Sequence, residues 1–146
     1  MTHIKRDKKL KKAFSLMELM VVIIILGLLA SLVMPNIIGK GEQAKQNLVC
    51  VQMESIANSL QMFKMDNGTY PDTEEGLEAL LKNPSEEKYP GYANGYLEKM
   101  PQDPWKHRYI YVKDENGAFD LISLGADGKE GGEEENKDLR LSTCSK

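Results

Sequence analysis

The sequence has few of the residues that enzymes use for catalysis. Among 146 residues there are two cysteines, two histidines and one tryptophan. One histidine, His3, lies in the basic N-terminal segment, and the other, His107, lies beside Arg108 in a predicted surface loop. There is no phosphate-binding segment of the G-x-x-x-x-G-K-[ST] type, and we find no nucleophile-and-base arrangement. We therefore predict that the protein is neither an enzyme nor an ATP-driven motor.

The main body of the chain also lacks a net positive charge. Residues 1–13 hold six Lys and Arg residues against one acidic residue, whereas the rest holds 13 basic and 21 acidic residues, a net charge of −8. Phosphate binding requires a positive surface on the folded part of a protein. The sequence therefore predicts no nucleic-acid partner.

There is one long apolar run, from Leu19 to Met34. Counted from Phe14, the stretch covers 21 residues with a single charge, Glu18. A helix of that length spans about 30 Å, the thickness of a bilayer core. The run is too long for an ordinary secretory signal and lacks a small-x-small cleavage site after it. We predict one membrane span, with the basic N-terminus in the cytoplasm.

Glu18 lies at the start of the apolar run, where a carboxylate is costly unless it is paired or reaches the membrane surface. The string KKAFSLMELMVV, residues 11–22, resembles the cleavage motif of the type IV pilin and pseudopilin family. The resemblance implies that a prepilin peptidase cuts between Ala13 and Phe14 and methylates Phe14, although Ala13 stands where the family usually has Gly. Glu18 would then neutralise the new N-terminal amine of a neighbouring subunit.

The apolar helix should kink or break at Pro35, which lacks an N–H group. The same resemblance implies that the stretch from Gly27 to Pro35 loses helicity in a filament. Helical periodicity returns over residues 42–66 and ends at Asn67-Gly68. The apolar positions that should form its buried face are Val49, Met53, Ile56, Leu60 and Phe63.

The remaining elements are short. A second helix should start at Asp72 or Thr73, with Asp72 and Glu75 spaced as a capping pair. Residues 109–112 and 119–124 read as two strands joined by a turn at residues 114–117. The predicted fold class is α+β, a long N-terminal helix packed on a small antiparallel sheet.

Five further segments resemble the major pseudopilins, or G subunits, of type II secretion systems. In chain order they are residues 64–71, 73–80, 95–97, 101–105 and 123–128. The resemblance runs from Phe14 to about Leu139. It implies a type IV pilin-like fold and a homopolymer that helps to drive folded proteins across the outer membrane. The implied partners are the prepilin peptidase, minor pseudopilins and the inner-membrane assembly platform.

Residues 123–138 form an acidic, glycine-rich stretch. Oxygen ligands on a flexible backbone suit Ca²⁺, but the spacing does not fit an EF-hand, and the residues alone favour a solvated loop. The family resemblance implies one calcium ion here. The implied ligands are the carboxylates of Asp127 and Asp138, the carbonyls of Leu124 and Lys129, and Glu135, which falls where relatives carry a hydroxyl ligand.

These observations predict three segments: a cleaved cytoplasmic leader, residues 1–13; a transmembrane assembly helix, residues 14–35; and a periplasmic domain, residues 36–146. Both cysteines, Cys50 and Cys144, would face the periplasm, where disulfides form, but the sequence leaves their pairing open.

Two alternatives remain. One is a type IV or competence pilin, in which two nearby cysteines commonly close a C-terminal loop, whereas Cys50 lies on the predicted long helix. The other is a membrane-tethered periplasmic binding domain, which would be monomeric and uncleaved at Phe14.

Overall fold

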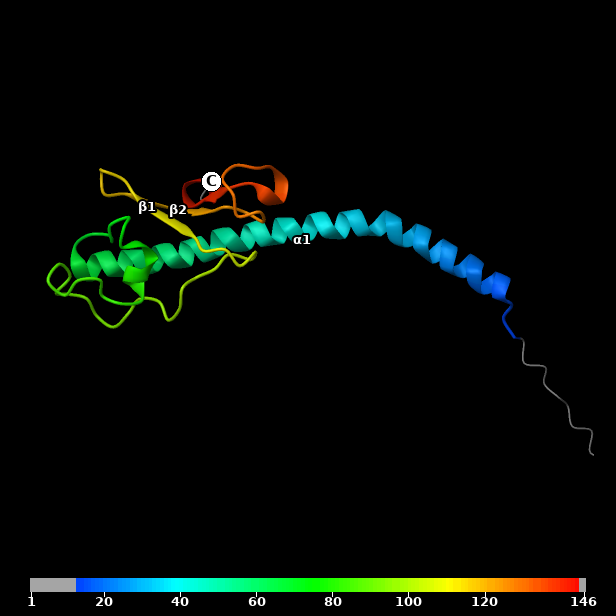
Figure 1. The fold of residues 1–146 in the computed structure, drawn as a ribbon, viewed down its shortest axis with the longest axis horizontal. Helices are drawn as coiled ribbons and strands as arrows, with labels where there is room; N and C mark the ends of the chain where they lie inside the picture. The colour runs from blue at the N-terminus through cyan, green and yellow to red at the C-terminus, as the bar shows by residue number, and fades with distance from the viewer. Residues whose placement is uncertain (1–12, 145–146) are drawn as a thin grey trace, which may run out of the picture. The chain divides into compact units, whose positions relative to one another are not determined.

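The computed structural model describes residues 13–144, with side chains throughout except at residues 33–38. Its contacts divide the chain into an N-terminal unit that ends at Gly39 and a C-terminal unit that begins at Lys40. The first element, α1 (Leu16–Asn67), is a helix of 52 residues whose residue range includes this boundary (Figure 1).

The prediction at Pro35 was a kink or a break, and the break is wrong, because α1 is helical through that position. Proline removes one backbone hydrogen bond from a helix. The residues on either side of Pro35 are Val33, Met34, Asn36 and Ile37. They have high or moderate helix propensity, and the remaining hydrogen bonds keep the helix continuous.

The predicted buried face of α1 is confirmed in the C-terminal unit. Its five apolar side chains are at most 2% exposed: Val49, Met53, Ile56, Leu60 and Phe63. Phe63 lies edge-to-face against Tyr89, with ring centroids 4.9 Å apart. The helix ends as predicted, where Gly68 adopts a φ of +81° and its N–H donates to the Lys64 carbonyl at 2.7 Å.

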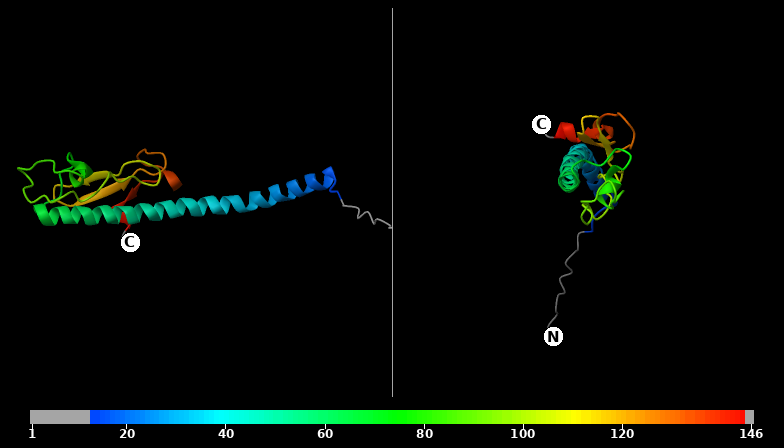
Figure 2. Two further views of the ribbon diagram at one scale, coloured as in Figure 1. Left: turned by 90° about the horizontal axis from the view of Figure 1, so that it is seen from below. Right: turned by 90° about the vertical axis from the view of Figure 1, so that its left-hand side faces the viewer.

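A small antiparallel sheet packs along this part of α1 (Figure 2). It has the order β1-β2-β3, with β1 at Ile110–Lys113, β2 at Phe119–Ser123 and β3 at Leu139–Arg140. The first two strands and their turn were predicted, and in the turn Gly117 has a φ of +82°. The two-residue strand β3 and the short helix α2 (Leu141–Cys144) were not predicted.

The predicted second helix is a 3₁₀ helix, η1 (Gly76–Leu80), preceded by a turn. Gly76 has a φ of +60°, a left-handed conformation that an α-helix starting at residue 72 or 73 excludes. One half of the predicted capping pair forms, since the Asp72 N–H donates to the Glu75 carboxylate at 2.9 Å. The Asp72 carboxylate instead accepts hydrogen bonds from Lys88 and Lys113.

Candidate functional site

The first candidate site is the exposed apolar segment of the N-terminal unit. Its large apolar side chains, from Phe14 to Leu32, are 46% to 84% exposed. Gly27 has open space where a side chain would extend, and Ala13 and Glu18 are also exposed. A contiguous apolar surface of this size marks an interaction site. Among the residues that the structure describes, no helix combines the length and apolar character needed to cross a membrane.

The start of α1 is capped in a way that the sequence analysis missed. The hydroxyl of Ser15 accepts the backbone N–H of Glu18 at 3.2 Å. Ser15 and Glu18 have the S-x-x-E spacing of a capping box, and a carboxylate in the first turn is favourable for the helix dipole. Glu18 is therefore placed to help start the helix, in addition to any role between subunits.

The second candidate site is the loop of residues 124–138, which joins β2 to β3 and is closed at its base by the Ser123–Leu139 pair. Asp127 accepts the N–H of Lys129 at 3.1 Å, and Asp138 accepts that of Gly131 at 2.9 Å. The carbonyl of Glu135 accepts the N–H of Ala126 at 2.8 Å, while the Glu135 side chain is exposed.

The loop fits a cation in one specific respect. The Oδ1 atom of Asp138 is buried and has no hydrogen-bond partner in the structure. A buried carboxylate oxygen is costly unless it is paired or binds a metal. Within residues 13–144 no group of three or more His, Cys, Asp or Glu side chains is arranged to hold a metal. A cation here would therefore depend on the two aspartates together with backbone carbonyls.

Side chains from outside the loop fasten it on two sides. Nε2 of Gln46, on α1, donates to the Glu134 carbonyl at 3.0 Å. On the other side, Nδ1 of His107 lies 3.0 Å from the Gly125 carbonyl oxygen. Contrary to the prediction of a surface position, His107 is half-buried and contacts the loop.

Cys50 and Cys144 form a disulfide, with their Cα atoms 5.5 Å apart. The bond attaches α2 to α1 and joins residues 94 positions apart in the sequence. Residues 141–144, which follow β3, are thereby fixed to the long helix.

A buried carboxylate, Asp103, organises the segment before β1 and was not singled out from the sequence. It is 3% exposed. Its Oδ1 accepts the backbone N–H groups of Trp105 and His107 at 3.0 and 2.9 Å, and its Oδ2 accepts the Ser123 hydroxyl at 2.8 Å. The only local signal was the tendency of Asp to bond the backbone two residues later.

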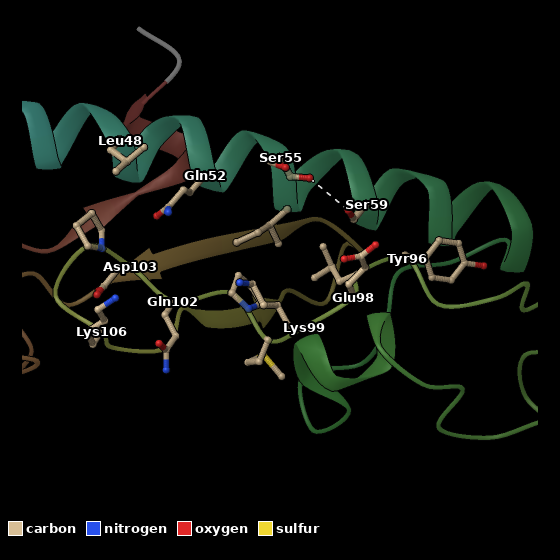
Figure 3. Close-up of a pocket in the computed structure, with 15 residues that line it drawn as sticks. Leu48, Gln52, Ser55, Ser59, Tyr96, Glu98, Lys99, Gln102, Asp103 and Lys106 are labelled. Carbon is tan, nitrogen blue, oxygen red and sulfur yellow. Dashed lines mark hydrogen bonds between the residues drawn. The ribbon is translucent and has the colours of Figure 1, made fainter.

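A groove of about 820 Å³ lies between α1 and the segment of residues 96–106 (Figure 3). The segment contributes all four charged side chains of the groove, and the helix contributes Leu48, Gln52, Ser55, Ile56 and Ser59. Of the charged side chains, Glu98, Lys99 and Lys106 are exposed, while the carboxylate of Asp103 is buried and accepts three hydrogen bonds. The groove shows no convergent set of reactive groups.

A helix that begins with an exposed apolar segment and then packs on a small antiparallel sheet defines the class of pilin-like filament subunits. Residues 36–142 match the sequence model of the family described as type II secretion system (T2SS), protein G. Residues 8–34 match the prokaryotic N-terminal methylation motif. The chain belongs to the type II secretion system protein G family.

Individual relatives agree with this assignment. The chain is 45% identical over 136 residues to the type II secretion system core protein G of Pseudomonas aeruginosa, covering 91% of this chain and 96% of the relative. It is 43% identical to the core protein G of Vibrio cholerae, covering 90% and 93%. The crystal structure of the major pseudopilin of enterohaemorrhagic Escherichia coli has a TM-score of 0.59 at 32% identity, covering 75% of this chain and 96% of that one.

Proposed function

We propose that the chain is the major structural subunit of a type II secretion pseudopilus, a homopolymer that helps to drive folded proteins across the outer membrane. The observation that carries the proposal is the match to core protein G relatives over nine-tenths or more of both chains. The role is structural and not enzymatic. Minor pseudopilins, the assembly platform and a prepilin peptidase are its expected partners.

Assembly would proceed through the N-terminal segment. Residues 1–13 would be removed between Ala13 and Phe14, Phe14 would be methylated, and residues 14–35 would anchor the subunit in the inner membrane. Residues 36–146 would form the periplasmic domain. The exposed apolar side chains of this segment and the methylation motif over residues 8–34 support this arrangement, because such a surface requires a bilayer or neighbouring helices to cover it.

The intact mass of the protein from its native membranes tests this processing. A species that starts at methylated Phe14 is expected. A species that retains residues 1–13 would contradict processing and favour a static, membrane-tethered domain.

Glu18 would pair with the N-terminal amine of a neighbouring subunit, because neither charge is stable alone among apolar helices. Glu18→Ala should leave membrane insertion intact and reduce filament yield. Because Ser15 caps the backbone N–H of Glu18, that cap survives the substitution, and helix content by circular dichroism provides the control. Normal filament yield from this variant would contradict the pairing.

The loop of residues 124–138 would bind one Ca²⁺ ion through the carboxylates of Asp127 and Asp138 and the carbonyls of Leu124 and Lys129, and the exposed side chain of Glu135 would turn inward as a further ligand. The unpartnered Asp138 Oδ1 supports this proposal. A bound ion would supply positive charge that links the two aspartates and holds the loop closed. Millimolar calcium should raise the melting temperature of the full chain in detergent, and Asp138→Asn should remove that increase. No increase in the wild type would contradict the site.

A further inference from the structure

His107 contacts the loop of residues 124–138, called the cation loop below, at two of its first residues. It is 17 positions or more away from them in the sequence. Its Nδ1 lies 3.0 Å from the Gly125 carbonyl oxygen. A carbonyl can only accept a hydrogen bond, so Nδ1 carries the proton and donates. The ring also packs on Gly128, where an added Cβ would lie 3.1 Å from its Cε1 and Nε2 atoms. One side chain therefore holds both ends of the segment from Gly125 to Gly128.

The position of His107 is itself fixed to the base of the loop. Its backbone N–H donates to Asp103 Oδ1 at 2.9 Å, and its carbonyl accepts the Asp103 N–H at 2.9 Å. The other oxygen of Asp103 accepts the hydroxyl of Ser123, the last residue of β2. Ser123 pairs with Leu139 across the loop base. The backbone that carries the imidazole is therefore fixed by hydrogen bonds to the buried residue Asp103.

The segment that His107 holds contains one residue expected to bind the ion and adjoins two others. Leu124 and Lys129 flank it and Asp127 lies within it. Gly125 and Gly128 have φ values of +70° and +65°, and glycine has unusual backbone freedom in an unfolded or mobile loop. An ion that must order such a segment binds more weakly, because the ordering entropy is subtracted from its affinity.

We propose that His107 is a positioning residue for the cation loop: it donates to the Gly125 carbonyl and packs on Gly128, and so sets the loop conformation before the ion binds. This inference rests on the calcium site proposed above. It does not make His107 a ligand. Loss of the hydrogen bond should weaken calcium binding roughly 3-fold to 10-fold, the effect of one net hydrogen bond.

Three variants of the full chain in detergent separate the contributions. His107→Phe keeps a ring against Gly128 and loses the donor. His107→Asn loses the ring and keeps an N–H donor where Nδ1 lies. Tyr111→Phe removes the hydrogen bond from Tyr111 to the Pro71 carbonyl, which lies outside the loop, and serves as the control for a general loss of stability.

Calcium dissociation constants by isothermal titration, with melting temperatures in EDTA, give the test. His107→Phe should bind calcium 3-fold to 10-fold more weakly, and His107→Asn should bind more tightly than the Phe variant. Tyr111→Phe should melt at a lower temperature with an unchanged dissociation constant. His107→Ala, without ring or donor, replaces the Phe variant in this comparison if the latter does not fold.

Three other outcomes would each overturn a stated part of the proposal. Wild-type affinity in His107→Phe would overturn the positioning role and leave the calcium site standing. Equal weakening in the Asn and Phe variants would overturn the assigned hydrogen bond. A wild-type chain that binds no calcium would overturn the calcium site and, with it, this role.

Discussion

Replacing both cysteines with serine, by Cys50→Ser and Cys144→Ser, removes the covalent link between α1 and α2. The link joins residues 94 positions apart. In the chain-entropy description, a bond that closes a loop of about this length raises the free energy of the unfolded chain by about 4.7 kcal/mol. Native disulfides in practice contribute about 2–5 kcal/mol of stability. We therefore expect the double variant to lose about 2–5 kcal/mol of unfolding free energy.

The loss should appear in the cooperative unfolding of the whole C-terminal unit. For a domain of about 100 residues, 1 kcal/mol corresponds to roughly 4–8 °C in melting temperature, so a decrease of at least about 8 °C is expected. Urea unfolding followed by tyrosine and tryptophan fluorescence measures the free energy. The wild type in dithiothreitol should match the double variant, and the double variant should not respond to dithiothreitol.

A double variant as stable as the wild type would contradict this prediction. Cys144 lies in a helix of four residues, so the bond could hold only that helix in place. In that case the double variant would unfold with the wild-type midpoint, and hydrogen exchange would increase only at residues 141–144. A loss below about 1 kcal/mol would refute the chain-entropy argument for this bond.

Substitutions at three other positions test separate features. Lys106 has a φ of +70°, in the left-handed region. Lys106→Gly should raise the urea midpoint, because relief of about 1–2 kcal/mol of backbone strain exceeds the entropy cost of glycine, about 0.5–1 kcal/mol. An unchanged or lower midpoint would argue against strain at this residue. Asp103→Ala should cost about 2–4 kcal/mol, since it leaves three donors without an acceptor, and Asp103→Asn should cost less. Hydrogen bonds donated by Lys88, and secondarily by Lys113, hold the pKa of the Asp72 carboxylate below its ordinary 3.8. The folded state therefore binds the proton less readily than the unfolded chain does. The stability that these bonds contribute is present above pH 3.8 and is lost as the pH falls below it. Lys88→Met should flatten the decrease in urea midpoint between pH 5 and pH 2, and an unchanged slope would contradict the pairing.

The parts of the fold that the sequence predicted are those with a local signal. The buried face of the long helix repeats with the helical period, at Val49, Met53, Ile56, Leu60 and Phe63. The turn at residues 114–117 separates two segments of high β-strand propensity. The errors arose where a local rule met a competing constraint. Pro35 does not end α1, and Gly76 requires a left-handed conformation that turns the predicted helix into a shorter 3₁₀ helix.

The candidate sites were predictable to different extents. The aspartates of the cation loop were named from the family resemblance, and their calcium binding remains a prediction. Asp103 and His107 were not assigned to a site, because their significance lies in contacts with Ser123 and Gly125, 20 and 18 positions away. No periodicity or spacing rule reports such long-range contacts, and only the folded structure brings them together.

The bond between Cys50 and Cys144 also determines the path of mechanical load. It closes the chain from residue 50 to residue 144 into a covalent ring that contains all three strands. Tension applied between residue 144 and the part of α1 before residue 50 passes directly through the sulfur atoms. The strands are bypassed, so such a pull cannot peel β3 from β2 while the bond is intact. In a filament subunit under tension, the sheet would be shielded from force along this path.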